Sequence, residues 1–193
     1  MTSTGGIVSL SGGGQLSGTG KLDVSGSTWV LGGDFLKSGG TLTISQTDLE
    51  LKDSIKLTSD VALSFVTLNL NDFKLTLGSS TSDLTVQNAI IIDTSTEGIS
   101  TGKADLILNS TLTMNYGLLD STGGTWEFNG DINKTSGTRS ITETDLTLTN
   151  NITLTSDEAL SFVNLNLNFS TLTLGSSTSD LTVENAITIG QMN

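Results

Sequence analysis

The sequence contains no cysteine, no histidine and no proline. Without cysteine the chain cannot form disulfides, thiolate metal sites or a cysteine nucleophile. Without histidine it lacks the commonest general base and the commonest ligand of transition metals. Missing proline fits a backbone in which nearly every N–H is needed for sheet hydrogen bonds. We therefore assign no catalytic, cofactor-binding or metal-binding residue from the sequence, and we expect no cofactor.

Basic residues are scarce, with eight Lys plus Arg against twenty Asp plus Glu and a net charge of −12. Nucleic acid is not an expected partner, because phosphate binding needs clustered positive charge. An anionic membrane surface is disfavoured for the same reason. No segment reaches the roughly 18 apolar residues of a membrane span, so membrane insertion is not expected. The opening "MTSTGGIVSL" lacks the basic segment and apolar run of a signal peptide.

The sequence repeats itself at a constant offset. "SDLTVQNAI" from Ser82 returns as "SDLTVENAI" from Ser179, and "SDVALSFVTLNLN" from Ser59 returns as "SDEALSFVNLNLN" from Ser156, each 97 residues later. Long internal repeats indicate architectures in which one unit stacks on the next. The chain is therefore predicted to be a single elongated domain made of two tandem repeats, 1–96 and 97–193.

Within each repeat, short segments alternate apolar and polar residues, such as "TLTI" at Thr41 and "DLEL" at Asp48. A period of two indicates β-strands, since neighbouring side chains point to opposite faces. No window shows the apolar spacing of a helix. The apolar positions from Leu49 onward stay apolar 97 residues later, whereas polar positions between them change, for example Glu50 to Thr147. Apolar positions are therefore expected to face a core and polar ones the solvent.

These strands of about four residues, joined by short links, predict an all-β parallel β-helix (β-solenoid) with three sides and about 20 residues per turn. The predicted columns of stacked side chains are Leu22, Leu42, Leu63 and Leu84 on one side, Leu49, Leu68 and Ile90 on the second, and Phe35, Ile55 and Leu75 on the third. A two-sided β-solenoid with about 14 residues per turn is the alternative. It has support because each repeat holds about 14 strand segments, a number divisible by two but not by three. Three sides are favoured because β-helix turns near 20 residues are common, and because the weak segment near Ile99 is interpreted as a loop.

Two features have both a structural and a functional interpretation. Trp29 and Trp126 occupy equivalent positions, where they either pack in the core or form an exposed platform for a ligand; we favour the core. The recurring aspartates could bind Ca²⁺, but we favour hydrogen bonds to nearby backbone in turns, because calcium-binding repeat motifs are missing. These aspartates are Asp60, Asp83, Asp157 and Asp180.

Enzymatic function is not expected. Polysaccharide-cleaving β-helices need clustered carboxylates with Arg or Lys on an outer face, and the sole arginine, Arg139, has no visible cluster around it. Ice binding by a flat threonine ladder needs one uniform side, whereas the aligned outward positions of the first repeat mix Thr43 with Ser64, and Glu50 with Asn69.

The duplicated x-L-T-L and x-L-x-V segments with Gly, Ser and Asn turns, no cysteine and acidic charge resemble the repetitive β-helical segments of large bacterial surface and secreted adhesins. The resemblance implies a rigid, non-catalytic stalk or adhesive module, a fragment of a larger protein, at the cell surface or outside the cell. Glycans or cell-surface components are the implied partners, and a cytoplasmic location stays open. The alternatives are an ice-binding or carbohydrate-binding β-helix and a filament subunit that associates end to end, since uncovered coil ends have unpaired backbone groups.

Overall fold

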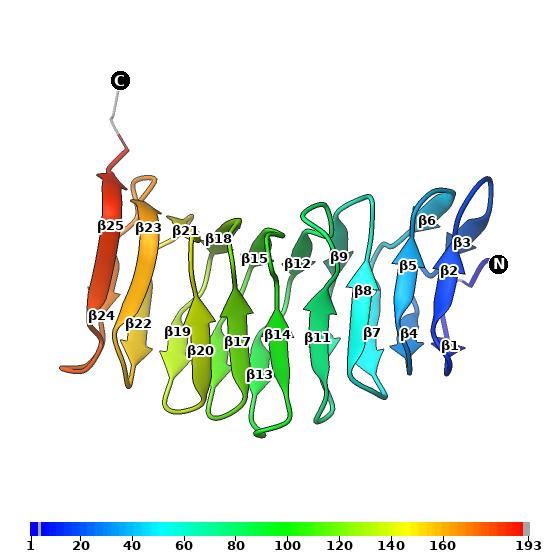
Figure 1. Cartoon of the computed structure of the whole chain (residues 1–193), viewed down its shortest axis with the longest axis horizontal. Coiled ribbons are helices and arrows are strands. Elements are labelled where there is room, and N and C mark those ends of the chain that lie inside the picture. The colour runs from blue at the N-terminus through cyan, green and yellow to red at the C-terminus, as the bar shows by residue number, and fades with distance from the viewer. Residues whose placement is uncertain (4, 191–193) are drawn as a thin grey trace.

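The computed structural model describes residues 1–3 and 5–190, which form one parallel β-solenoid of about nine turns with about 20 residues per turn. Its strands stack along the longest axis of the molecule, with the earliest strands at one end and β25 at the other (Figure 1). The described residues contain no helix, and hence no helix that is long and apolar enough to cross a membrane. The prediction of a three-sided coil is confirmed, and the two-sided alternative is wrong.

Successive strands occupy the three sides in turn. Side 1 consists of a four-stranded sheet followed by a five-stranded sheet, with the strands β1 (Ile7–Leu10), β4 (Thr28–Leu31), β7 (Asp48–Leu51) and β10 (Leu68–Asn69), then β13 (Ile90–Ile92), β16 (Leu112–Met114), β19 (Ile132–Lys134), β22 (Ile152–Ser156) and β24 (Leu172–Leu174). Side 2 contains a seven-stranded sheet, with the strands β2 (Gly14–Leu16), β5 (Phe35–Lys37), β8 (Ile55–Thr58), β11 (Lys74–Leu77), β14 (Gly98–Ser100), β17 (Leu118–Ser121) and β20 (Thr138–Ile141).

Side 3 begins with a two-stranded sheet and continues as a seven-stranded one, with the strands β3 (Lys21–Asp23) and β6 (Thr41–Thr43), then β9 (Leu63–Phe65), β12 (Leu84–Val86), β15 (Leu106–Leu108), β18 (Thr125–Phe128), β21 (Asp145–Leu148), β23 (Leu160–Asn166) and β25 (Leu181–Thr188). The last two strands are long enough to turn a corner, which is marked by a register shift between Phe162 and Asn164. Their first halves therefore extend side 2, and their second halves extend side 3.

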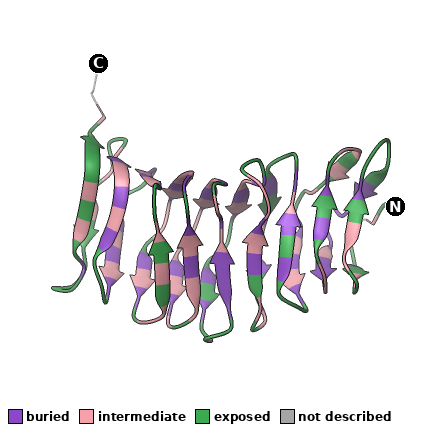
Figure 2. Cartoon of the chain, viewed as in Figure 1, coloured by how far each residue is buried: buried purple, intermediate pink, exposed green. Residues whose placement is uncertain are grey.

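The core is a column of aliphatic and aromatic side chains that runs through every turn. On side 3, Leu63, Leu84 and Leu106 are stacked in register, and all three are at most 1% exposed. Alternation along each strand produces the banding of buried and exposed residues in Figure 2. Burying one such side chain contributes roughly 1.5–3 kcal/mol before entropy losses, so this core stabilises the coil without disulfides or metal.

Parts of the predicted columns are confirmed. The pairs Leu22–Leu42, Leu63–Leu84, Leu49–Leu68 and Ile55–Leu75 are adjacent in register. The prediction for Phe35 is wrong, because Phe35 pairs with Leu57 instead of Ile55. Leu31 and Leu51 are in register, so the chain advances four residues to reach Phe35 but six to reach Leu57. Asp34 Oδ1 accepts the backbone N–H of Lys56 at 2.7 Å within this longer stretch.

Three further expectations also need correction. The stack from Leu42 to Leu63 is interrupted, since the two residues lie in separate sheets of side 3. The stack from Leu68 to Ile90 is interrupted in the same way on side 1, where β10 has only two residues and gives the next strand little to pair with. Ile99 does not lie in a loop. It is in β14, it pairs with Leu75 and Leu119, and it is fully buried, because a single isoleucine flanked by Gly and Ser still fills one inward position.

The sequence repeat does not equal a whole number of turns. Trp29 lies in β4 and its equivalent Trp126 lies in β18, fourteen strands later, whereas five turns of a three-sided coil would need fifteen. Equivalent residues are therefore displaced by one side: Trp29 is on side 1 and Trp126 on side 3. Both tryptophans are core residues, 0% and 2% exposed. Their rings make edge contacts with Phe35 and Phe128, with centroids 4.9 and 5.9 Å apart.

Candidate functional site

The most distinctive polar chemistry lies where the wall of the coil is interrupted. On side 3, no ladder pairing joins β6 to β9 among the described strands. The equivalent break in the second repeat lies on side 2, between β20 and the start of β23. We call these interruptions the first and second ladder gaps. The corner that enters β9, residues 59–62, is one residue longer than the corner that enters β6, residues 38–40, so the two strands do not meet in register. Buried backbone N–H and C=O groups that lose their ladder partners at these places need side chains as hydrogen-bond partners.

A buried lysine closes the first ladder gap. Lys37 occupies an inward position of β5, in register with Leu16, and is only 5% exposed, while its partner Asp60 is 44% exposed. The amine of Lys37 donates a hydrogen bond to Asp60 Oδ1. The aliphatic part of a lysine can pack in a core while its charged end reaches the surface. Lys37 therefore fills apolar space inside the coil and still keeps its charge paired.

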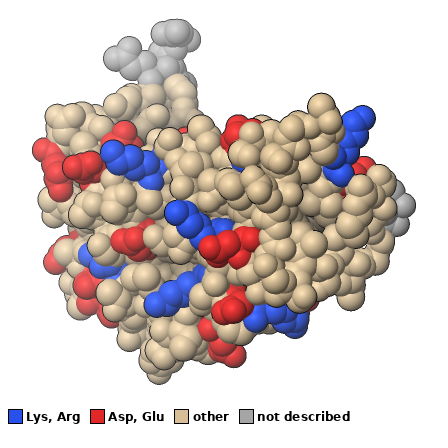
Figure 3. Space-filling view, turned by 45° about the vertical axis from the view of Figure 1, so that its right-hand side comes forward, with Lys and Arg blue, Asp and Glu red and all other residues tan. Residues whose placement is uncertain are grey.

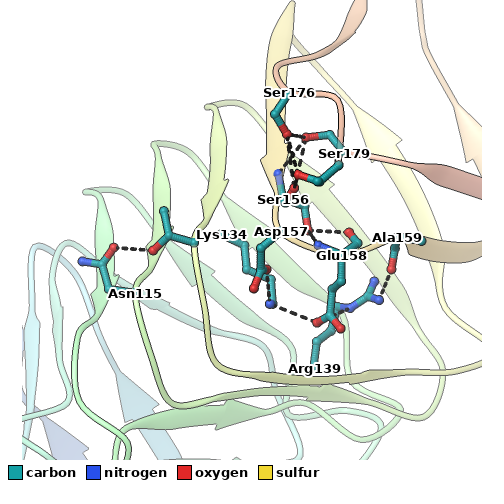
Figure 4. Close-up of polar contacts among 11 residues, drawn as sticks. Asn115, Lys134, Arg139, Ser156, Asp157, Glu158, Ala159, Ser176 and Ser179 are labelled. Carbon is teal, nitrogen blue, oxygen red and sulfur yellow. Dashed lines mark hydrogen bonds and ion pairs between the residues drawn. The ribbon is translucent and has the colours of Figure 1, made fainter.

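The second ladder gap repeats this arrangement and enlarges it (Figure 4). Lys134 is 4% exposed, and its amine lies 2.5 Å from Asp157 Oδ1 and 2.9 Å from Glu158 Oε1. Lys134 and Asp157 are the equivalents of Lys37 and Asp60, whereas Glu158 replaces Val61 of the first repeat. The lysine of the second repeat is thus paired with two carboxylates, whereas the equivalent lysine of the first repeat is paired with one.

Arg139 completes the second cluster. It stands where the first repeat has Leu42, in register with Leu119 of the core. Its Nη2 donates to the carbonyl of Ala159, and its Nε lies 3.6 Å from Glu158 Oε1, which is an ion pair but too long for a hydrogen bond. Burial lowers the pKa of Arg139, and the nearby carboxylates of Glu158 and Asp157 act in the opposite direction. The guanidinium thereby connects β20 to the corner that leads into β23, where no ladder pairing is present.

Serine hydroxyls replace missing backbone partners beside both gaps. The backbone N–H of Ser59 donates to Ser82 Oγ at 2.8 Å, and Ser79 Oγ donates to the carbonyl of Ser59 at 3.0 Å. The equivalent N–H of Ser156 donates to Ser179 Oγ at the same distance. Buried backbone groups need such partners. This requirement explains why the "GSSTSD" segment is preserved in both repeats.

The core next to the second gap encloses a small cavity. Its volume is ≈ 20 Å³, space for about one water molecule, and its lining includes Met114, Phe128, Arg139 and Phe162. Sites for organic ligands or cofactors usually measure about 300–1,000 Å³. The cavity is therefore too small for a substrate. Of the two cations that line it, Lys134 is paired with carboxylates, whereas Nε and Nη1 of Arg139 are buried without a hydrogen-bond partner.

The turn aspartates are not equivalent in the structure. Asp60 and Asp157 pair with buried lysines, while Asp83 Oδ1 accepts the backbone N–H of Asp105 in the next turn at 3.0 Å. Our interpretation that they bind nearby turn backbone is therefore wrong for Asp60 and Asp157, because their carboxylates pair with lysines. It holds in part for Asp83, which accepts a backbone N–H, but from the next turn instead of its own. For Asp180, only a backbone bond is seen, from the N–H of Leu160 to its carbonyl at 2.8 Å. Within residues 1–3 and 5–190, no three acidic residues gather in the manner of a metal site.

Sequence reasoning missed the ion-paired lysines and the cluster around Arg139. A signal was present, since the strand segments "FLK" and "INK" place Lys37 and Lys134 at inward positions of the alternation in both repeats. A lysine preserved at an inward position indicates a buried pair. Its acidic partner, 23 residues away, could not be identified without the register of the turns.

The outer surface has no uniform face. The outward row of side 3 contains Ser64, Thr85, Ile107, Glu127 and Thr147 in register. Acidic and basic side chains are interspersed on the face shown in Figure 3. Ile107 and Glu127 separate Thr85 of the first repeat from Thr147 of the second, so the threonines of this row are not contiguous. The flat threonine ladder that ice binding requires is therefore not formed on side 3.

Comparison with known proteins identified no relative. No protein-family model matches the chain, and neither a curated protein nor a solved structure matches it.

Proposed function

We propose that this chain is a non-catalytic structural module, a rigid stalk or spacer segment of a bacterial surface or secreted protein. The observation that supports the proposal best is the continuity of the coil. A single core runs from β1 to β25, and where the ladder is interrupted on one side it continues on the other two. Pairing also crosses the boundary between the two repeats without a linker, as between β12 and β15. A flexible joint needs a segment with few buried contacts, and none interrupts this core.

The polar features of the molecule also support a structural role. Both buried lysines are paired with carboxylates, and Arg139 donates one hydrogen bond to the carbonyl of Ala159, which is consistent with a role in stabilising the wall. The proposed location outside the cell fits the acidic, cysteine-free composition and the resemblance to repetitive adhesin segments.

An adhesive role is the second candidate. The exposed apolar side chains away from the ends include Ile91 and Tyr116, 58% and 55% exposed, and an exposed aromatic ring can stack on a sugar. A glycan array tests this role: binding that is lost in Tyr116→Ala would make the module an adhesin, and an array without binding leaves the spacer role.

The spacer role is tested by lengthening the chain with further copies of residues 97–193. Each copy adds fourteen strands, or four and two-thirds turns, and strands are spaced about 4.8 Å apart, so each copy should add about 22 Å. Small-angle X-ray scattering at low concentration should show a maximum dimension that rises linearly with copy number. Growth with the square root of copy number, as in a flexible chain, would contradict the proposal.

A further inference from the structure

At the C-terminal end of the described coil, apolar side chains of the last turn are exposed to solvent. Ile187 and Ile189 are 58% and 67% exposed, whereas their equivalents in the first repeat, Ile90 and Ile92, are 1% and 0% exposed. The local sequence is nearly the same in both places. The difference in burial arises because another turn covers Ile90 and Ile92, and no described residue covers β25, which is exposed along most of its length in Figure 2.

Inside the chain, the covering turn consists of β14, β15 and β16. These strands pair with β11, β12 and β13, and so bury the surface whose second-repeat equivalent is exposed at β24 and β25. The junction between the two repeats is therefore a complete example of what covers such a surface.

The N-terminal end of the chain has the same strands as that covering turn. Val8 of β1 pairs with Trp29 as Leu106 of β15 pairs with Trp126, and Gly14 of β2 pairs with Phe35 as Leu112 of β16 pairs with Ile132. Strands β1 and β2 are the first strands of their sheets, with a free edge toward the N-terminal end.

The counterpart of β14 is also present. Residues 1–3 run parallel to β3, with a bridge between Thr2 and Asp23 and a 3.0 Å bond from the N–H of Ser3 to the carbonyl of Asp23. Strand β14 lies beside β17 in the same way. All three elements of the covering turn thus recur at the opposite end of the molecule from β25 (Figure 1).

We propose that two copies of this chain associate head to tail, with the N-terminal turn of one copy covering β24 and β25 of the other in the register of the internal junction. In that register Leu181 faces Val8 of the second copy, as Leu84 faces Leu106 within the chain. Edge strands with unpaired N–H and C=O groups favour such pairing. The contact joins different surfaces, so it does not close, and further copies can add to each end.

The geometry of the resulting filament follows from the strand count. Counting residues 1–3 and each half of β23 and β25 separately gives 28 strand segments, or nine and one-third turns. At about 4.8 Å per turn, each copy should lengthen the filament by about 45 Å and be rotated by one third of a turn. Since each copy has a net charge of −12, salt should promote the association by screening repulsion.

The register is tested by mixing two single-cysteine variants of the full chain, Ser9→Cys and Thr182→Cys, under mild oxidation. Ser9 and Thr182 are equivalent in structure to Ile107 and Thr85, which are adjacent outward residues of the internal junction. The expected product is a mixed disulfide dimer. Thr85→Cys is the matched control, since it has the same sequence context but its neighbours in register, Ser64 and Ile107, belong to the same chain. Its mixture with Ser9→Cys should yield no such dimer. Equal cross-linking in both mixtures would overturn the proposed register.

The association itself is measured by sedimentation velocity from about 1 to 100 µM, a range that covers weak contacts. The full chain should form species above 20.0 kDa that increase with protein and salt concentration. The variant Ile187→Lys/Ile189→Lys should stay monomeric, and Ile91→Lys, a change at an outward position away from both ends, should associate like the native chain. A native chain that remains monomeric throughout would overturn the proposal, as would association of the double-lysine variant at native strength.

Discussion

Trp29 and Trp126 are equivalent in the sequence repeat and lie on different sides of the coil. Each tryptophan is nevertheless buried beside a phenylalanine, because every side of the coil offers the same inward position. The repeat therefore preserves the core environment of a residue, and it changes the direction in which the outward neighbours of that residue point. The two repeats therefore do not place equivalent outward residues in one row along a side, as a repeated ligand-binding row would require. They do form a uniform wall, which agrees with the proposed spacer role.

The two leucines of the repeated "SDLTV" segment should differ in their contribution to stability. Leu84 is fully buried between two turns, whereas Leu181 lies in the last turn and is only partly buried. Leu84→Ala should lower the free energy of unfolding by about 3 kcal/mol, and Leu181→Ala by about 1 kcal/mol or less, since a cavity forms only in the first case. Urea unfolding at low concentration measures both values. Equal losses would show that the last turn is covered in solution.

The ion pairs in the ladder gaps predict a difference between two aspartates. Asp60→Asn removes the carboxylate paired with buried Lys37, whereas after Asp157→Asn the amine of Lys134 keeps Glu158 at 2.9 Å. An uncompensated buried charge costs about 3–5 kcal/mol, so Asp60→Asn should be the more destabilising change, by roughly 2 kcal/mol. Urea unfolding of both variants tests this order. Adding Glu158→Gln to Asp157→Asn should lower the free energy of unfolding about as much as Asp60→Asn does, because Lys134 then loses both carboxylates. If the double variant is no less stable than Asp157→Asn alone, Glu158 does not compensate the charge of Lys134.

Replacing the buried lysine itself should have a different effect from removing its partner. Lys134→Met keeps an unbranched apolar side chain in the core and leaves Asp157 and Glu158, 42% and 46% exposed, free to be hydrated. The variant should unfold within about 1 kcal/mol of the native chain, and Lys134→Ala should lose about 2–4 kcal/mol because it leaves a cavity. If Lys134→Met is as unstable as Lys134→Ala, the charge and not the packing of the stem is the main contribution.

A backbone conformation shared by both repeats predicts a stabilising change. Asp72 and its equivalent Phe169 have φ angles of 71° and 68°, in the left-handed region that aspartate tolerates better than bulky residues. Phe169 is also 61% exposed, so it gains little from burial. Phe169→Asp should raise the free energy of unfolding by about 1 kcal/mol, and Asp72→Phe should lower it by a similar amount. Thermal unfolding followed by circular dichroism measures both shifts, and a fall in melting temperature for Phe169→Asp would contradict this assignment.

The sequence predicted those parts of the fold that depend on single strands and their alternation. The inward positions, the parallel pairing and the three sides all follow from short x-L-x-L segments with polar links. The lateral register could not be predicted fully, because it depends on how much chain each corner takes up. Phe35 pairs with Leu57 in place of Ile55 because the chain takes six residues after Leu51, instead of the four after Leu31, to reach the same position. The short β10 interrupts the stack from Leu68 to Ile90.

The candidate site was hidden from the sequence for the same reason. Lys37 and Asp60 are 23 residues apart, and only the register of neighbouring turns shows that they meet. Arg139 gave no signal from the repeat, since its equivalent is Leu42. The count of about fourteen strands per repeat agrees with the structure, but it favours two sides only if each repeat fills a whole number of turns. The structure shows that a repeat can begin on one side and end on another.

The rigidity of the coil is measured most directly by the distance between two spin labels on side 3. The chain has no cysteine, so Ser64→Cys and Thr188→Cys introduce the only attachment points. These residues are six ladder steps apart, which corresponds to about 29 Å, and the pair Ser64 and Thr147 is four steps apart, about 19 Å. Pulsed dipolar spectroscopy, with unlabelled chain in excess, should give one narrow distribution for each pair, separated by about 10 Å. Broad distributions, or a separation that does not follow the number of steps, would contradict the stiff parallel coil.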